Sequence, residues 1–290
     1  MRSTLLGIAV NLILVLIKGT AGVVGHSYAL IADAVESATD VLSSLIVWWG
    51  LRLSARPADA NHPQGHGKAE PMAAAVVGVL LLGAAILVAW QSVQEILVPH
   101  TMPAPWTLLV VVGVMGVKWV LSRHVFAVAS ETESLAVKGD AWHHRSDALT
   151  SLAAFIGIGV ALIGGAVSPD PRWSAADDWA AMIAAAVIAL NGFTILRGAV
   201  YELSDPHPGE ELEAEVRRIA AGVSGVANLH KCFVRKMGFD YYVELDVRVD
   251  RHLPVYRGHE IAHAVQDAVR REMAGRRFAR VLVHIEPTLE

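Results

Sequence analysis

The sequence predicts a mainly α-helical membrane protein, in which six transmembrane helices precede a small α+β domain. Three observations support this fold class. The 290 residues are 54% hydrophobic, and the mean hydropathy of +0.44 is too high for an ordinary soluble protein. Six apolar segments are each long enough to cross about 30 Å of hydrocarbon. After Tyr201 the composition becomes that of a soluble domain.

The apolar segments are expected to be helices, because lipid does not tolerate an unpaired backbone. The stretches 71–94 and 148–169 contain no Asp, Glu, Lys or Arg. The expected spans are residues 4–25, 28–52, 71–97, 105–127, 134–164 and 177–201.

Basic residues gather in alternate loops. Arg52, Arg56 and Lys68 lie around the loop between the second and third spans, and Arg123 and Lys138 lie near the loop between the fourth and fifth. The other loops are poorer in Lys and Arg. The positive-inside bias therefore places both termini and the C-terminal domain in the cytoplasm.

The charge and the cysteine count exclude some classes of protein. The net charge of −4 gives no indication of nucleic-acid binding. Because Cys232 is the single cysteine, an intrachain disulfide and a multi-cysteine zinc site are both excluded.

We predict a transmembrane domain over residues 1–203, a linker over 204–208 and a cytoplasmic domain over 209–290. Pro206 and Pro208 stop the last transmembrane helix. Hydrophobic periodicity then predicts the order αββαβ, which is typical of a two-layer α+β domain. The predicted elements are helices 210–221 and 257–273 and strands 227–236, 241–249 and 279–285.

Two pairs of metal-ligating residue types lie within the apolar segments. Glu36 and Asp40 are four residues apart, and His143 and Asp147 have the same spacing. At that spacing the two members of a pair share one face of a helix. Carboxylates at membrane depth are costly and usually functional. Two such helices could offer four N and O ligands to one divalent cation.

The alternative is that these acids only hold helices together by pairing with Lys18, Lys118 or Arg145. The two lysines could equally extend to the membrane interface. Asp33 could line the route of such a cation, but helix packing is the preferred interpretation for that residue.

The loop between the second and third spans contains three further ligand types within eight residues. These are Asp59, His62 and His66, and zinc accepts their O and N donors. Pro63 and Gly65 allow the tight turns that would bring them together. The alternative is a solvated polar loop.

The chain resembles the cation diffusion facilitator transporters over nearly its whole length. The resemblance rests on ADAVESATDVLSS in the second span, HPQGHGKAE in the next loop, HHRSDALTS in the fifth span, and the small C-terminal domain. It implies a six-helix membrane domain, a ferredoxin-like cytoplasmic domain and a homodimer in a bacterial cytoplasmic membrane. It also implies export of divalent metal from the cytoplasm against protons.

The resemblance assigns roles residue by residue. Many zinc-transporting relatives have Asp or His where this chain has Glu36. In the tail, Glu286 stands where Asp is common and Asp246 where His is common. The implied residues are the transport site Glu36, Asp40, His143 and Asp147, the loop site Asp59, His62 and His66, the tail site Asp246, His259, His284 and Glu286, and a salt bridge at the dimer between Lys68 and Asp205.

Zn²⁺ is the expected substrate and regulatory ligand, with export of Fe²⁺ or Mn²⁺ as the alternative. The motif HEIAH at residues 259–263 fits the zinc-peptidase pattern, so a membrane metalloprotease is a second alternative. A metal sensor or channel without proton coupling also stays open.

Overall fold

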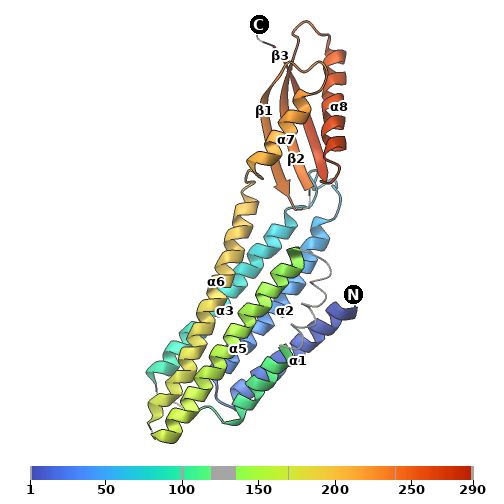
Figure 1. Cartoon of the computed structure of the whole chain (residues 1–290). Helices are drawn as coiled ribbons and strands as arrows, with labels where there is room; N and C mark the ends of the chain where they lie inside the picture. The colour runs from blue at the N-terminus through green and yellow to red at the C-terminus, as the bar shows by residue number, and fades with distance from the viewer. Residues whose placement is uncertain (1, 99–100, 119–134, 169, 239, 289–290) are drawn as a thin grey trace. The chain divides into compact units, whose positions relative to one another are not determined.

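The computed structural model describes residues 2–98, 101–118, 135–168, 170–238 and 240–288, and for residues 2–10, 135–149 and 171 it describes the backbone alone. Long helices fill the N-terminal two thirds of the chain, and a small sheet with two helices follows (Figure 1). The long helices are α1 (Arg2–Val24), α2 (Tyr28–Ser54), α3 (Ala69–Leu97), α5 (Leu135–Val167) and α6 (Ala175–Leu203).

The helices coincide with the predicted segments. A further apolar helix covers Trp106–Lys118, where the description of the fourth segment ends. A short 3₁₀ helix, Pro171–Ser174, precedes α6, and Asp170 caps it by accepting a hydrogen bond from the backbone N–H of Arg172. The fourth segment beyond Lys118 lies outside the described residues.

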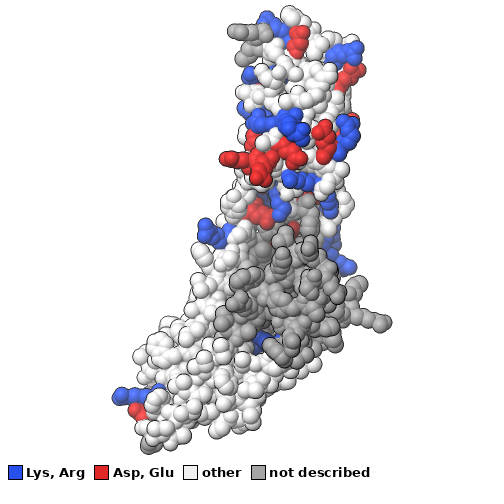
Figure 2. All heavy atoms as spheres, in the orientation of Figure 1, with Lys and Arg blue, Asp and Glu red and all other residues white. Residues whose placement is uncertain are grey.

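Within the described residues, three helices are long and apolar enough to cross a membrane: Ala69–Leu97, Thr150–Val167 and Arg172–Leu203. Asn11–Val24 and Trp106–Lys118 are apolar but shorter. Figure 2 shows Lys, Arg, Asp and Glu concentrated over the C-terminal domain, with few on the visible face of the helices. The protein is mainly helical, with a small three-stranded sheet. That it crosses the membrane six times stays a prediction.

The described chain forms two compact units. The first contains Met1–Ile46 and Val76–Leu196, and the second contains Val47–Ala75 and Arg197–Glu290. The predicted domain boundaries at 203 and 209 stay a prediction.

In the first unit, apolar side chains from different helices pack together. One cluster joins Ala21, Leu30, Val111 and Ile158, which come from α1, α2, the 106–118 helix and α5. A second joins Val77, Leu81, Ala85 and Ile188, so that α3 packs on α6.

The C-terminal domain has the predicted order αββαβ. Its elements are α7 (Glu210–Ala221), β1 (Asn228–Met237), β2 (Asp240–Val249), α8 (Val255–Glu272) and β3 (Phe278–Pro287). The sheet order is β1-β2-β3, with β2 antiparallel to β1 and parallel to β3.

Alternation along β2 separates the two faces of the sheet. Val243, Leu245 and Val247 are buried in one core with residues of α7 and α8. Because successive side chains of a strand point to opposite faces, Glu244 and Asp246 lie on the face away from that core. The second face is therefore the one that can carry polar or metal-binding groups.

Gly238, after β1, meets both a conformational and a steric requirement. Its φ of 59° is in the left-handed region that favours glycine. A Cβ there would lie 2.6 Å from Ser54 Oγ and 2.8 Å from the Gly67 carbonyl oxygen. The β1–β2 hairpin therefore approaches the segment after α2 closely, and both belong to the second unit.

Candidate metal sites

The acidic face of α2 carries the first predicted site. Glu36 is 3% exposed and Asp40 is half-buried, one helical turn further along. His143 and Asp147 have the same spacing on α5, but their side chains lie outside the described residues. The four-residue transport site is therefore described on α2 only and stays a prediction.

A buried ion pair lies one turn before Glu36 on the same helix. Lys18 Nζ is 3.0 Å from Asp33 Oδ1, and both side chains are fully buried. The same ammonium donates hydrogen bonds to the Asp33 carbonyl oxygen at 3.0 Å and to Ser37 Oγ at 2.6 Å. Ser151 Oγ of α5 donates to Asp33 Oδ1 at 3.1 Å. Asp33 thus joins α1, α2 and α5, in agreement with the packing interpretation.

The predicted loop site is a compact cluster. Asp59 Oδ1 is 3.2 Å from His62 Nδ1, and Asp59 Oδ2 is 3.3 Å from His66 Nε2. One ligand atom from each of the three residues lies within 4.8 Å of the others. Gly65, with a φ of 82°, makes the turn between the two histidines. The spacing thus brings the three donors together, and metal binding by them stays a prediction.

The loop backbone prepares Asp59 as an ionised ligand. The N–H of His62 donates to Asp59 Oδ1 at 2.7 Å, and the N–H of Asn61 donates at 2.9 Å. The hydrogen bond from the His62 N–H is the main cause that lowers the pKa of Asp59. Ligating carboxylates must be deprotonated, so this shift favours metal binding.

The loop is attached to neighbouring parts of the second unit. The Tyr242 hydroxyl donates a hydrogen bond to the Gln64 carbonyl oxygen. Burial raises the pKa of Tyr242, which keeps the phenol protonated as a donor. The predicted pair of Lys68 and Asp205 is present within one chain, with Nζ and Oδ2 at 2.9 Å. Its role at a dimer contact stays a prediction.

The outer face of the sheet holds a second cluster of ligand types. One ligand atom each from His230, Asp246 and Glu286 lies within 4.8 Å of the others. His230 Nδ1 is 3.0 Å from Glu286 Oε2, and Arg248 Nε donates to the same oxygen at 3.3 Å. Burial raises the pKa of Glu286, but these two hydrogen bonds outweigh it and hold the pKa below its usual value.

The structure groups the predicted tail residues differently from the prediction. Asp246 and Glu286 belong to the cluster with His230, whereas His259 lies on α8 with its Nε2 3.2 Å from His263 Nε2. His284 is exposed and faces Asp246 in the strand register, yet it is not in the cluster among the described side chains. The α8 pair follows from the i, i+4 spacing of HEIAH.

His230 is a possible metal ligand of this cluster that the sequence did not predict. The pairing of β1 with β2 shifts between Leu229 and Lys231, so His230 is an extra residue in β1. A β-bulge of this kind places two residues opposite one. His230 and Lys231 both approach Asp246, and Lys231 Nζ is 3.7 Å from Asp246 Oδ2. The sequence offers no signal for this shift.

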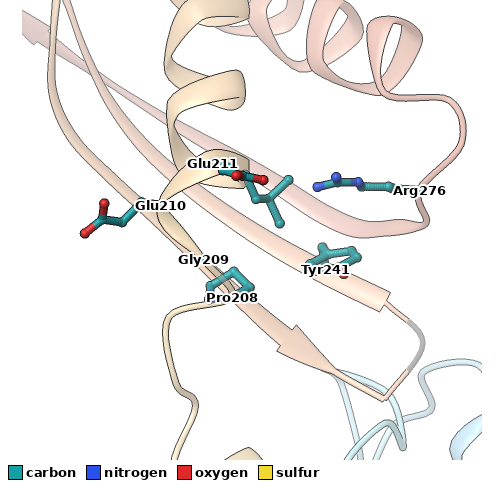
Figure 3. Close-up of a pocket in the computed structure, with 7 residues that line it drawn as sticks. Pro208, Gly209, Glu210, Glu211, Tyr241 and Arg276 are labelled. Carbon is teal, nitrogen blue, oxygen red and sulfur yellow. The ribbon is translucent and has the colours of Figure 1, made fainter.

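The C-terminal domain also has an open pocket of about 590 Å³, drawn in Figure 3. Tyr241 and Arg276 face the first turn of α7, and Glu210 points away from Arg276. The predicted metal ligands do not line it. Its lining residues are Pro208, Gly209, Glu210, Glu211, Leu212, Tyr241 and Arg276.

Comparison with known proteins covers both halves of the chain. The family model described as cation efflux transmembrane domain matches residues 4–204. The model described as cation efflux protein, cytoplasmic domain, matches residues 208–288.

Two similar proteins span most of the chain. Manganese efflux system protein MneP of Bacillus subtilis is 30% identical over 294 residues, which cover 100% of this chain and 96% of that protein. Magnetosome protein MamM of Paramagnetospirillum magneticum is 34% identical over 269 residues, covering 91% and 81% respectively. Among solved structures, a cadmium form of the MamM CTD is 29% identical, covers 27% of this chain and 96% of that chain, and has a TM-score of 0.26.

Proposed function

Because the chain belongs to the cation diffusion facilitator family of metal efflux transporters, we propose that it exports Zn²⁺ from the cytoplasm in exchange for protons. Members of this family are transporters and not enzymes, so the metalloprotease alternative at HEIAH is set aside. The local geometry agrees, because Glu260 is paired with Arg257 at 2.7 Å on the exposed face of α8.

The observation that supports this proposal most strongly is the burial of Glu36 on α2. A carboxylate that is 3% exposed, in a helix of the cation efflux transmembrane region, is costly to bury and is usually functional. We propose that Glu36 binds a divalent cation together with Asp40, His143 and Asp147. Four N and O ligands from two helices make a site that a small relative shift of the helices can open.

Proton exchange follows from the chemistry of the four ligands. A metal ion binds ionised carboxylates and a neutral imidazole, so binding releases protons and protonation ejects the metal. Protons that load the emptied site on the outer side would prevent it from returning as bare negative charge. His143 is the group proposed to titrate near neutral pH.

Mn²⁺ is the second candidate substrate. Three carboxylates with one imidazole suit Mn²⁺ as well as Zn²⁺, and the manganese efflux system protein MneP is 30% identical over the whole chain. Fe²⁺ stays an alternative from the same ligand chemistry.

The other proposed sites regulate transport. We propose that the Asp59, His62 and His66 cluster and the His230, Asp246 and Glu286 cluster bind the same metal in the cytoplasm. We also propose a homodimer in a bacterial cytoplasmic membrane, with both termini cytoplasmic. Cross-linking in native membranes, with proteolysis from each side, tests the dimer and the orientation.

The direct test uses purified protein in sealed liposomes with a metal-sensitive dye inside and an imposed pH gradient. Asp40→Asn should abolish gradient-dependent uptake of Zn²⁺, because the substitution removes one ligand charge but keeps the side-chain volume. Glu95→Gln is the matched control on α3, and it should transport at the wild-type rate. Initial rates for Zn²⁺, Mn²⁺, Fe²⁺ and Cd²⁺ rank the substrates.

Three results would contradict the proposal. Wild-type rates in Asp40→Asn would remove Asp40 from the transport site. Uptake that is unchanged when the pH gradient is collapsed would indicate a channel. An initial rate for Mn²⁺ far above that for Zn²⁺ would identify Mn²⁺, and not Zn²⁺, as the substrate.

A further inference from the structure

We propose that Asp33 is a positioning residue of the transport site. With Lys18, Ser37 and Ser151 it forms the Asp33 network, which holds the turn of α2 that carries Glu36 against α1 and α5. The inference deepens the proposed function and rests on Glu36 and Asp40 being transport ligands.

The first contact fixes α1 to α2. A lysine ammonium has three N–H donors and no acceptor. Lys18 Nζ lies 3.0 Å from Asp33 Oδ1, and it donates hydrogen bonds to the Asp33 carbonyl oxygen at 3.0 Å and to Ser37 Oγ at 2.6 Å. All three acceptors belong to one turn of α2, from residue 33 to residue 37, and Glu36 is in that turn. The turn therefore cannot rotate without disturbing a fully buried charge.

The second contact fixes α2 to α5. Ser151 Oγ, also fully buried, donates to Asp33 Oδ1 at 3.1 Å. On α2, Asp33 precedes Glu36 by three residues. On α5, Ser151 follows position 147 by four residues. At about 1.5 Å of rise per residue the contact lies about 5 Å along each helix from a proposed ligand position. The network is thus one turn from the site on both ligand-bearing helices.

The surroundings of Asp33 distinguish positioning from metal binding. Its Oδ1 accepts from Lys18 and Ser151, and Lys118 Nζ lies 3.9 Å away. Two ammonium groups so close to one carboxylate repel a further cation, and the repulsion is strong at low dielectric. Asp33 is therefore suited to holding the helices and not to carrying the metal along the route.

The two contacts differ in strength, which indicates where the site opens. Separating Lys18 from Asp33 would break an ion pair between two fully buried side chains, whereas separating Ser151 from Asp33 costs one hydrogen bond from a neutral donor. We infer that α1 and α2 move together and that the shift that releases metal breaks the Ser151 contact.

The test measures metal uptake into liposomes driven by a pH gradient. Asp33→Asn should lower the maximal rate at least about tenfold, because it removes the carboxylate charge that faces the buried Lys18 ammonium and displaces Glu36. A misplacement of about 1 Å costs about 100-fold in enzymes. The double variant Lys18→Met with Asp33→Asn removes both charges, and it should recover to within about threefold of wild type. A metal ligand would not be rescued by removing Lys18.

Asp177→Asn is the matched control. Asp177 is equally buried and accepts hydrogen bonds at the start of α2, from Ser27 Oγ just before the helix at 2.8 Å and from the Ala29 N–H at 3.2 Å, away from Glu36. The Asp177→Asn variant should transport metal at the wild-type rate. If the double variant elutes as a folded protein and stays as slow as Asp33→Asn, the proposal is wrong. Absence of gradient-driven uptake by wild-type protein would instead overturn the proposed function itself.

Ser151→Ala tests the second contact and separates affinity from turnover. Losing the Ser151 hydrogen bond leaves no unpaired charge, so the maximal rate should stay within about twofold of wild type. The KM for metal should change about tenfold, as expected for a hydrogen bond to a charged group. An unchanged KM would show that the contact between α2 and α5 does not position the ligands.

Discussion

At the scale of single residues, burial decides the chemistry of Cys232. This residue is 3% exposed in the core of the C-terminal domain, and burial raises its pKa to about 11. The thiolate is the nucleophile, so a rise of about two units lowers its fraction at neutral pH about 100-fold. We expect a maleimide to label the native protein at least about 100-fold more slowly than the unfolded protein. Mass spectrometry of timed samples gives both rates.

The pH dependence of that labelling provides a second check. The rate should keep rising tenfold per pH unit beyond pH 9, where an ordinary cysteine has levelled off. Cys232→Ser gives the background. Rapid labelling of native protein at pH 7 would show that the strand bearing Cys232 is exposed in solution.

Asp205 combines an ion pair with an unusual backbone conformation. It contacts Lys68 at 2.9 Å and has a φ of 53°, which costs about 1–2 kcal/mol for most residues and less for Asn. Asp205→Asn should lower the apparent melting temperature slightly, because the half-exposed pair contributes under about 1 kcal/mol. Asp205→Ala should lower it further. Differential scanning fluorimetry in detergent compares them, and equal melting temperatures would show that the backbone conformation is not strained.

The proximity of side chains is predictable from the sequence where spacing alone sets it. Asp59, His62 and His66 are within eight residues in a turn-rich loop, and the structure brings their donors together. Lys18 and Lys118 were both possible partners for an acid from the sequence alone. That Lys18 pairs with Asp33 is known only from the packing of α1 on α2, which brings together residues 15 positions apart in the sequence.

At the scale of elements, glycines set the distance between α3 and α6. A Cβ on Gly78 would lie 2.8 Å from Leu196 Cβ, whereas a Cβ on Gly83 of the same helix would meet nothing within 4 Å. Gly78→Ala should therefore destabilise the protein by about 1–3 kcal/mol through overpacking. Gly83→Ala should be neutral or stabilising, because alanine favours the helix.

Thermal unfolding of the two glycine variants in detergent provides the comparison. A melting temperature for Gly78→Ala at or above that of Gly83→Ala would mean that the helices separate without cost. The expected order is Gly83→Ala at or above wild type, with Gly78→Ala below it.

Elements were predictable where periodicity is strong. The alternation in β2 and the 3.6-residue period in α8 gave both elements to within a few residues. The bulge at His230 was not predictable, because it depends on how β1 pairs with β2 and not on either strand alone. His259 was assigned to the tail site by resemblance, and α8 instead places it beside His263.

At the scale of the whole molecule, the C-terminal domain has a core of its own. Its buried cluster runs from Leu212 to Val281, with contributions from both helices and all three strands. We expect residues 206–290 to fold as an independent soluble domain. Val247→Ala should lower its free energy of unfolding by about 2 kcal/mol, because Val247 is fully buried.

Val255→Ala is the matched control, since the same methyl groups are removed from a side chain that is 91% exposed. It should change the free energy by less than about 0.5 kcal/mol. Urea unfolding followed by circular dichroism measures both. A non-cooperative transition in the isolated wild-type domain would show that it needs the rest of the chain.

The hydrogen bond from Tyr242 to Gln64 has a consequence for the energetics of the loop site. It ties the segment that carries Asp59, His62 and His66 to the β1–β2 hairpin. Equilibria that share a contact are linked, and the linkage is reciprocal. If a cation orders this segment, it strengthens the attachment of the hairpin by the same factor by which the attached hairpin strengthens cation binding. A change confined to the hairpin, such as Tyr242→Phe, would then shift the metal concentration at which the loop fills without altering any ligand.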